Sequence, residues 1–301
     1  MNILPDIMRA TLAQPVLLML FAAAPSTAQT GLPLPAVPDS LRTPGKRAAY
    51  LMEHFWDEMD FRDTLRSRDE RFMEQNLVNF MSLFPHAGTD DVQRSVTLLT
   101  GRAAADGKAF MMVADLAAKY LYEKESPMFS ELYYTMFLDG IRSSAAGTAS
   151  LRSRAAFLFD AIRRNFPGTV AADFQMVLRD GRRSSLAETP ARTTVLLFYD
   201  PHCDGCMAAV RSLSGDSALR SLAESGKITV LAVYTEGDAA VWQRTKDTLP
   251  EWWTVGADTG GILHDDIYFL PSMPSLYLIG ADRTVILKDA SVEELLEAVS
   301  R

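Results

Sequence analysis

The two cysteines of the chain lie three positions apart, at Cys203 and Cys206, and they are its only cysteines in 301 residues. They directly follow the apolar run 195–199, which is typical of a buried strand, and they precede a segment with helical periodicity. A thiol at the N-terminus of a helix has a lowered pKa, and the thiolate is the form that attacks disulfides. The pair therefore predicts a disulfide that opens and closes within the chain.

Other interpretations of this cysteine pair are open on the sequence. A zinc site normally needs four ligands, whereas the chain has no second CxxC and only scattered histidines, so we expect no metal. The pair could also be a static structural disulfide, or two inert thiols on a redox-type scaffold.

Length and composition indicate a globular chain of two domains. Hydrophobic residues make up 48% of the sequence and charged residues 23%, which is enough apolar material for sizeable cores. The formal net charge of -8 does not suggest a nucleic-acid partner, because such proteins carry basic patches.

The N-terminus has the features of an export signal. Arg9 precedes the apolar stretch 16–24, and the small residues 26–28 offer a cleavage site. The stretch is shorter than a membrane span, so we expect residues 1–28 to be removed and the mature chain to lack an integral membrane span. A signal anchor or an unstructured tail are the alternatives. We expect an exported protein of the periplasm or cell envelope of a Gram-negative bacterium, where disulfides persist.

The apolar periodicity changes at Pro167–Gly168 and divides the remaining chain there. In the predicted helical domain, residues 29–166, helical spacing without strand alternation begins at Thr43 after an extended proline-rich segment, and the aromatic side chains predict a helical core rather than a ligand groove. Residues 167–301 alternate between strand and helix patterns. We therefore predict an all-α helical domain, without recognisable chemistry, followed by an α/β domain. The expected strands are 174–178, 193–199, 228–234, 252–255, 275–279 and 284–287. Three helices are expected: one from the cysteine pair through Leu213, one over 239–248, and a final one capped by Ser291.

This order of elements resembles a thioredoxin fold, of the extracytoplasmic branch related to cytochrome-maturation and peroxiredoxin-like proteins. Three matches carry the resemblance: the strand pair within 173–186, the run 196–199 before the cysteines, and the segment 273–279, which resembles a cis-proline loop. The whole chain is also similar to exported bacterial proteins that join a helical domain of unknown function to such a domain. That second match lies in residues 43–44, 47–51, 54–56, 119–122 and 126–128.

The resemblance implies a role for each site residue. Cys203 would attack a substrate disulfide and Cys206 would resolve the mixed disulfide, while Met273 and Pro274 would position the substrate through the backbone. The partners would be protein thiols or disulfides and an upstream redox protein. No cofactor is implied beyond the Cys203–Cys206 disulfide itself.

The chain departs from the family pattern around the cysteines. His202 and Gly205 replace the usual tryptophan and proline, and Ala209 and Leu197 stand where relatives carry proton acceptors. Three neighbouring side chains are candidates for tuning the thiol pKa, although they could equally be solvated loop residues: Asp200, His202 and Asp204. A protonated His202 would stabilise a thiolate and make the disulfide more oxidising.

The sequence thus predicts an exported thiol-disulfide oxidoreductase, with reduction, oxidation and isomerisation all open. The rival is an envelope protein-binding or assembly module in which the thioredoxin-like domain is mainly a scaffold, and the missing proton acceptors favour it. A peroxidase is a third option, although Pro201 and His202 stand where the usual Thr-x-x-Cys context would be.

Overall fold

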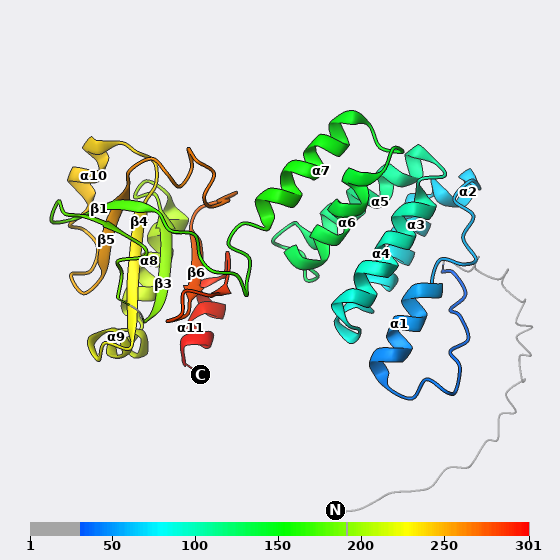
Figure 1. Ribbon diagram of the computed structural model, residues 1–301, viewed down its shortest axis with the longest axis horizontal. Helices are drawn as coiled ribbons and strands as arrows, with labels where there is room; N and C mark the ends of the chain where they lie inside the picture. The colour runs from blue at the N-terminus through cyan, green and yellow to red at the C-terminus, as the bar shows by residue number, and fades with distance from the viewer. Residues whose placement is uncertain (1–30, 191, 301) are drawn as a thin grey trace, which may run out of the picture.

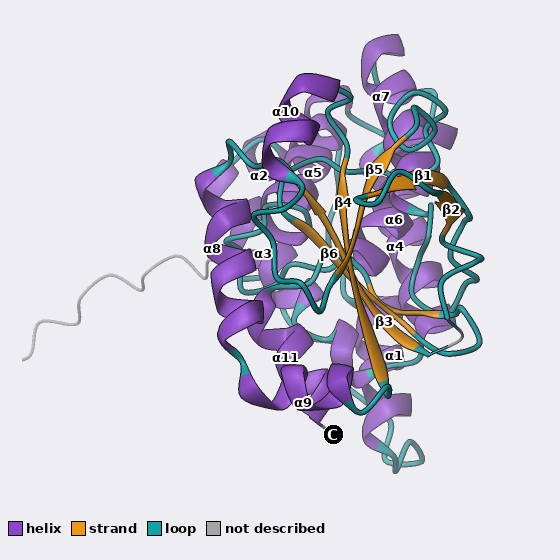
Figure 2. Ribbon diagram, turned by 90° about the vertical axis from the view of Figure 1, so that its left-hand side faces the viewer, coloured by secondary structure: helices purple, strands orange, loops and turns teal. Residues whose placement is uncertain are grey.

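The computed structural model describes residues 31–190 and 192–300 and consists of a helical part followed by a sheet-containing part (Figure 1, Figure 2). The predicted fold class, an all-α domain before an α/β domain of thioredoxin type, is confirmed. The predicted signal peptide, residues 1–28, lies outside the described residues. Within the described ranges, no helix combines the length and apolar character needed to cross a membrane. The helices of the first part are α1 (Pro44–His54), α2 (Thr64–Ser67), α3 (Glu70–Met81), η1 (Phe84–His86), α4 (Thr89–Ala103), α5 (Gly107–Leu121), α6 (Glu131–Ser143) and α7 (Ala149–Ile162).

The helical part has one continuous apolar core in which aromatic rings pack against each other. Phe80 contacts Phe55, Trp56 and Phe84, with ring centroids 5.1 to 5.9 Å apart, and all four side chains are buried. Edge-to-face pairs of this kind stabilise a core beyond the area they bury. These four aromatic residues therefore pack the helical core, as predicted.

Helix α6 crosses α4 at very close range. Gly140 of α6 lies against Thr100 of α4, where an added Cβ would stand 2.9 Å from both Cβ and Cγ2 of Thr100. Thr100 is buried and its hydroxyl donates to the carbonyl of Val96, 3.0 Å away within its own helix. The glycine is thus required by packing at this crossing.

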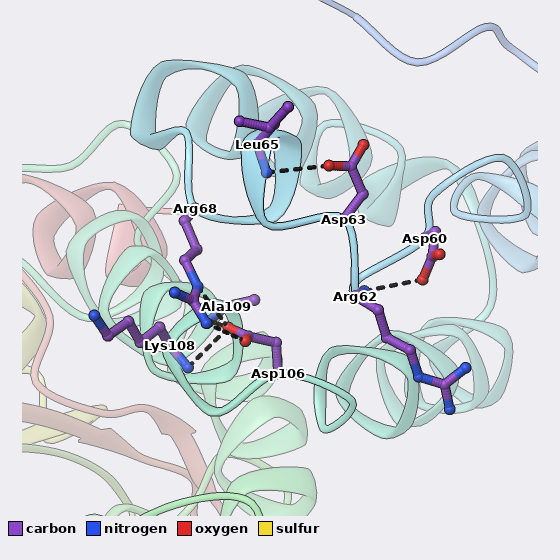
Figure 3. A network of polar contacts seen from close by, with 8 residues as sticks. All are labelled: Asp60, Arg62, Asp63, Leu65, Arg68, Asp106, Lys108 and Ala109. Atoms are coloured by element: carbon purple, nitrogen blue, oxygen red, sulfur yellow. Dashed lines mark hydrogen bonds and ion pairs between the residues drawn. The ribbon is translucent and has the colours of Figure 1, made fainter.

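Asp106 joins the start of α5 to the loop before α3 (Figure 3). Its carboxylate accepts the backbone N–H groups of Lys108 and Ala109 and two hydrogen bonds from the Arg68 guanidinium, at 3.2 and 2.6 Å. Arg68 is the main reason that the pKa of Asp106 is lowered to about 2, and the N–H of Ala109 adds to the effect. The same side chain therefore caps one helix and anchors its neighbour.

The second part is built on one seven-stranded sheet with the order β2-β1-β5-β4-β3-β6-β7. The central strands β3, β4 and β5 are parallel, whereas β6, β7, β1 and β2 join antiparallel. Continuous apolar runs form β3 and β4 because both faces of the sheet are covered there. The strands are β1 (Gln175–Leu178), β2 (Arg183–Ser185), β3 (Thr193–Tyr199), β4 (Ile228–Tyr234), β5 (Thr254–Asp258), β6 (Ser275–Ile279) and β7 (Val285–Leu287).

Helices cover one face of the sheet, and loops cover the other. Figure 2 shows α8 (Asp204–Gly215), α9 (Ser217–Glu224), α10 (Ala239–Thr245) and α11 (Val292–Ser300) on one side of the twisted strands. Residues from all four helices share a core with the odd-numbered positions of β3. The even-numbered positions pack instead against the loops 171–174 and 262–270, where Tyr268 is buried.

The structure contains short helices that the sequence prediction lacks, and it shifts several ends. Helix α9 follows α8 after a single residue, Asp216, whose side chain caps it, so the break is invisible in the apolar pattern. Helix α2, with only four residues, is too short to leave a periodic pattern. The strand expected over 252–255 is β5, two to three residues later, since Trp252 and Trp253 belong to the preceding turn.

Polar and aromatic contacts join the two parts. Lys288, after β7, pairs with Glu131 at the start of α6, with 2.8 Å between Nζ and Oε2. Their side chains are only 2% and 12% exposed. Phe157 of α7 also meets Phe269 edge-to-face. The domain boundary at 166/167 stays a prediction; α7 ends at Ile162 in the helical part.

Candidate active site

Cys203 and Cys206 lie where β3 ends and α8 begins, as predicted. Cys203 is the N-cap of α8, and its Sγ accepts the backbone N–H of Cys206 at 3.2 Å. The thiol is half-buried and therefore reachable from solvent. A sulfur at this position receives both a hydrogen bond and the partial positive charge of the helix N-terminus.

Cys206 is fully buried behind Cys203, between the first turn of α8 and the sheet. Its Sγ accepts the backbone N–H of Asp200 at 3.5 Å. Burial raises the pKa of the Cys206 thiol to about 12; the hydrogen bond from the Asp200 N–H opposes this shift, whereas the Cys203 thiol and the Asp200 carboxylate add to it. Both cysteines are free thiols in this structure. The arrangement pairs an accessible sulfur with a hidden one.

The loop before β6 lies against the cysteines. The peptide bond between Met273 and Pro274 is cis, as the sequence prediction had it. The Met273 carbonyl lies 3.8 Å from Cys203 Sγ, and a Cβ on Gly205 would be 3.5 Å from Pro274 Cδ. The two residues expected to position a substrate therefore lie beside the cysteine pair, although Met273 is 70 residues from Cys203 in sequence.

The three candidate tuning residues differ in their placement. Asp200 donates its backbone N–H to Cys206 and accepts the N–H of His202 at 2.9 Å. The His202 ring, whose side chain is 67% exposed, lies 3.5 Å from the Asp200 carboxylate. Asp204 is exposed in the first turn of α8 and makes no side-chain contact with either sulfur among the described residues. Only Asp200 thus touches the pair directly.

The positions at which relatives carry proton acceptors are filled here by packing residues. Leu197 on β3 and Ala209 on α8 are both buried and belong to the core around Cys206. Hydrogen bonds to the Cys206 thiol come from the Asp200 backbone and from Cys203. In the described part of the chain, no group of three or more His, Cys, Asp or Glu side chains is arranged to hold a metal ion.

A groove beside Pro274 extends this site beyond the residues found from sequence. It has a volume of about 760 Å³, and its lining includes Leu276, residues 287–294 and, from the helical part, Lys124 and Phe129. Sequence reasoning used 126–128 only for the family resemblance and assigned no chemistry there. The sequence offers only a weak indication of a binding surface there: a Ser126–Pro127 turn followed by Phe129, between two predicted helices.

Comparisons with known proteins found a family that matches the helical part and a solved structure that matches most of the chain. Residues 21–165 match a family described as a domain of unknown function, DUF5106. A thioredoxin-like protein from Bacteroides caccae is 28% identical and superposes with a TM-score of 0.80, over 89% of this chain and 98% of that one. The helical and sheet-containing parts are therefore similar to that structure together.

Two further solved structures match only part of the chain. A conserved protein of unknown function from Bacteroides fragilis is 32% identical over 44% of this chain and 98% of that one, with a TM-score of 0.43. The thioredoxin domain of a thiol-disulfide oxidoreductase from Bacteroides vulgatus is 16% identical over 45% and 96%, with a TM-score of 0.41. A search of curated proteins gave no match.

Proposed function

Because the chain is a thioredoxin-like protein with an N-terminal domain of unknown function, we propose that it exchanges thiols and disulfides with other proteins through Cys203 and Cys206. One observation carries the proposal. The half-buried Cys203 sulfur caps α8, lies 3.8 Å from the Met273 carbonyl and has a second thiol directly behind it. This is the geometry that a two-thiol exchange requires.

The exchange proceeds in two displacements. The Cys203 thiolate attacks one sulfur of a substrate disulfide, whose S–S bond breaks and releases the other sulfur as a thiolate. The Cys206 thiol then loses its proton and attacks Cys203 Sγ, which frees the second substrate sulfur. The substrate gains two electrons, and the protein is left with a Cys203–Cys206 disulfide. A dithiol partner returns it to the reduced form; the reverse sequence oxidises a substrate.

Single cysteine variants test this function. Cys203→Ser should abolish reduction of insulin disulfides, whereas Cys206→Ser should accumulate a covalent mixed disulfide that reducing agents release. Far-ultraviolet circular dichroism serves as the control for folding of both variants. Activity equal to that of the original protein in both variants would remove the redox role.

A binding or assembly module of the cell envelope is the second candidate. The observation that favours it is the environment of Cys206, where leucine and alanine replace the usual proton acceptors. Under this alternative the protein would not equilibrate with small dithiols over a range of redox buffers. Measuring the fraction of oxidised protein in such buffers separates the two functions.

We also propose that the protein is exported and works in the periplasm or cell envelope. The support is the sequence before residue 29, where an arginine, an apolar stretch and small residues follow one another. N-terminal sequencing of the protein from its native envelope should find a chain beginning near Gln29. An uncleaved N-terminus in the cytoplasmic fraction would contradict export.

A further inference from the structure

The groove beside Pro274 has walls from both parts of the protein. One wall comes from the segment around the start of α11, and the other from the loop between α5 and α6. We infer that this loop, residues 122–130, forms part of the site for protein substrates, and that the groove binds an extended segment with apolar and basic side chains beside the reacting cysteine. The inference rests on the proposed function and names the substrate chemistry of that same site.

The helical wall is fixed in place. Lys124 Nζ lies 2.6 Å from the Asp289 carboxylate and 2.9 Å from the Ser272 hydroxyl, so it contacts the second part at two points. The loop is closed internally, because the N–H of Ser130 donates to Leu121 and that of Phe129 to Ser126. A wall held in this way loses little conformational entropy when it binds a partner.

The wall is connected to the reacting cysteine through the loop before β6. Ser272, which accepts the hydrogen bond from Lys124, directly precedes Met273, whose carbonyl is 3.8 Å from Cys203 Sγ. The backbone N–H of Met273 has no backbone partner within the described residues. An extended polypeptide can pair with such a free edge and continue into the groove.

The side chains of the groove indicate what would bind there. Phe129 is 37% exposed although its loop is rigidly closed, and it faces the groove together with Pro127. An aromatic side chain presented in this way is a typical anchor for an apolar residue of a partner.

The charges of the groove favour a basic partner. Lys124 is paired with Asp289, and Lys288 with Glu131, so these four charges cancel. The carboxylates of Glu293 and Glu294 are exposed at the first turn of α11 and have no basic partner among the described contacts. The uncompensated charge is therefore negative, which complements lysine or arginine.

The test compares peptide disulfides with a small disulfide on the full chain. The probes are a disulfide-linked peptide whose cysteine is flanked by leucine and lysine, its counterpart with glutamate in place of lysine, and oxidised 2-mercaptoethanol. Phe129→Ala should lower kcat/KM for the leucine-lysine peptide about tenfold and leave the small disulfide unchanged. Leu98→Ala, with a similarly exposed side chain on α4 outside the groove, is the matched control and should change neither.

Charge reversal provides the second arm. Glu293→Lys should abolish the preference for the lysine peptide over the glutamate peptide, because the new lysine cancels the charge of Glu294; Glu58→Lys, the same change on an exposed site of the helical part, should leave the preference intact. If the original protein exchanges with the small disulfide and Phe129→Ala and Leu98→Ala behave alike on all probes, the groove is not the substrate site, although the proposed function stands. Failure to exchange with any of the three disulfides would overturn both.

Discussion

The two sulfurs of the site differ in exposure and in their hydrogen-bond partners. Cys203 is reachable and its sulfur accepts a backbone N–H at the start of α8. Cys206 is fully buried, and burial raises the pKa of its thiol to about 12. The first displacement therefore falls to Cys203, and the second depends on removing a proton from Cys206. We expect that proton transfer to limit the cycle.

The pH dependence of the second displacement tests this expectation. Far below a pKa of about 12, the thiolate fraction of Cys206 rises tenfold for each pH unit, so resolution should accelerate steeply between about pH 6 and pH 9. Burial, the largest cause of the shift, persists when Cys203 is engaged in a mixed disulfide. The measurement is the release of thionitrobenzoate from its mixed disulfide with Cys203, followed by absorbance. Cys206→Ser is the control and should retain the label. A flat profile would mean that a neighbouring group takes the proton.

The cysteines and Pro274 were found from sequence because each belongs to a local pattern: a buried strand before CxxC, and a proline before an apolar strand. Phe129 and Lys124 were missed because nothing local marks them. Lys124 reaches Ser272 across 148 residues, and only the fold shows that contact. Sequence patterns thus predict the reacting atoms, whereas the surfaces that select a substrate depend on how distant loops meet.

At the scale of elements, the sequence predicted both the existence and the end residues of the strands that are apolar on both faces. The bounds of β3 and β4 agree with the predicted 193–199 and 228–234, because a continuous apolar run needs cover on both sides of a sheet. Helix α2 has four residues, too few for a periodic pattern, whereas α9 is amphipathic but follows α8 after a single residue, so the sequence does not mark it as a separate helix. Close helix crossings are likewise invisible in the sequence, since they depend on one small residue.

The crossing of α4 and α6 should not tolerate a methyl group at Gly140. An alanine there would overlap Thr100, and the helices would have to separate, which costs about 1–3 kcal/mol. Urea unfolding of the full chain, followed by circular dichroism, measures the loss. Gly101→Ala is the matched control on α4: its Cβ would meet no atom within 4 Å, and the helix should gain about 0.5–1 kcal/mol. Equal stability of the two variants would refute the packing argument.

At the scale of the whole molecule, the two parts meet through charged groups as well as apolar ones. Lys288 is 2% exposed and donates to both the Glu131 carboxylate and the Ile162 carbonyl at the end of α7. Lys124 adds an ion pair and a hydrogen bond on the groove side. A buried charge is stable only when its partner is correctly placed. These pairs therefore stabilise one docked arrangement of the two parts much more than others. The width of the groove then depends on these pairs.

Lys288→Met therefore should weaken the docking of the two parts severely. Burial raises the pKa of Glu131, and Lys288 opposes that shift. Without the lysine, the carboxylate is left buried and unpaired, which costs about 3–5 kcal/mol near neutral pH. The loss should shrink as the pH falls toward the ordinary glutamate pKa. A carboxyl group with a raised pKa in the folded state binds its proton more readily there than in the unfolded chain, so acid relieves the folded state first. Urea unfolding at neutral and mildly acidic pH measures both effects.

A second substitution distinguishes a buried charge from lost packing. In the double variant Lys288→Met/Glu131→Gln no charge is left unpaired, so most of the stability should return and its pH dependence should disappear. Lys46→Met, which removes an exposed lysine of α1, is the matched control and should change stability by less than about 0.5 kcal/mol. Tryptophan fluorescence adds the domain-level readout, because Trp56 lies in the helical core and Trp242 and Trp253 lie in the core of the second part. If docking depends on the Lys288–Glu131 pair, the urea unfolding transitions followed by circular dichroism and by fluorescence should coincide in the original protein. They should separate in Lys288→Met and coincide again in the double variant.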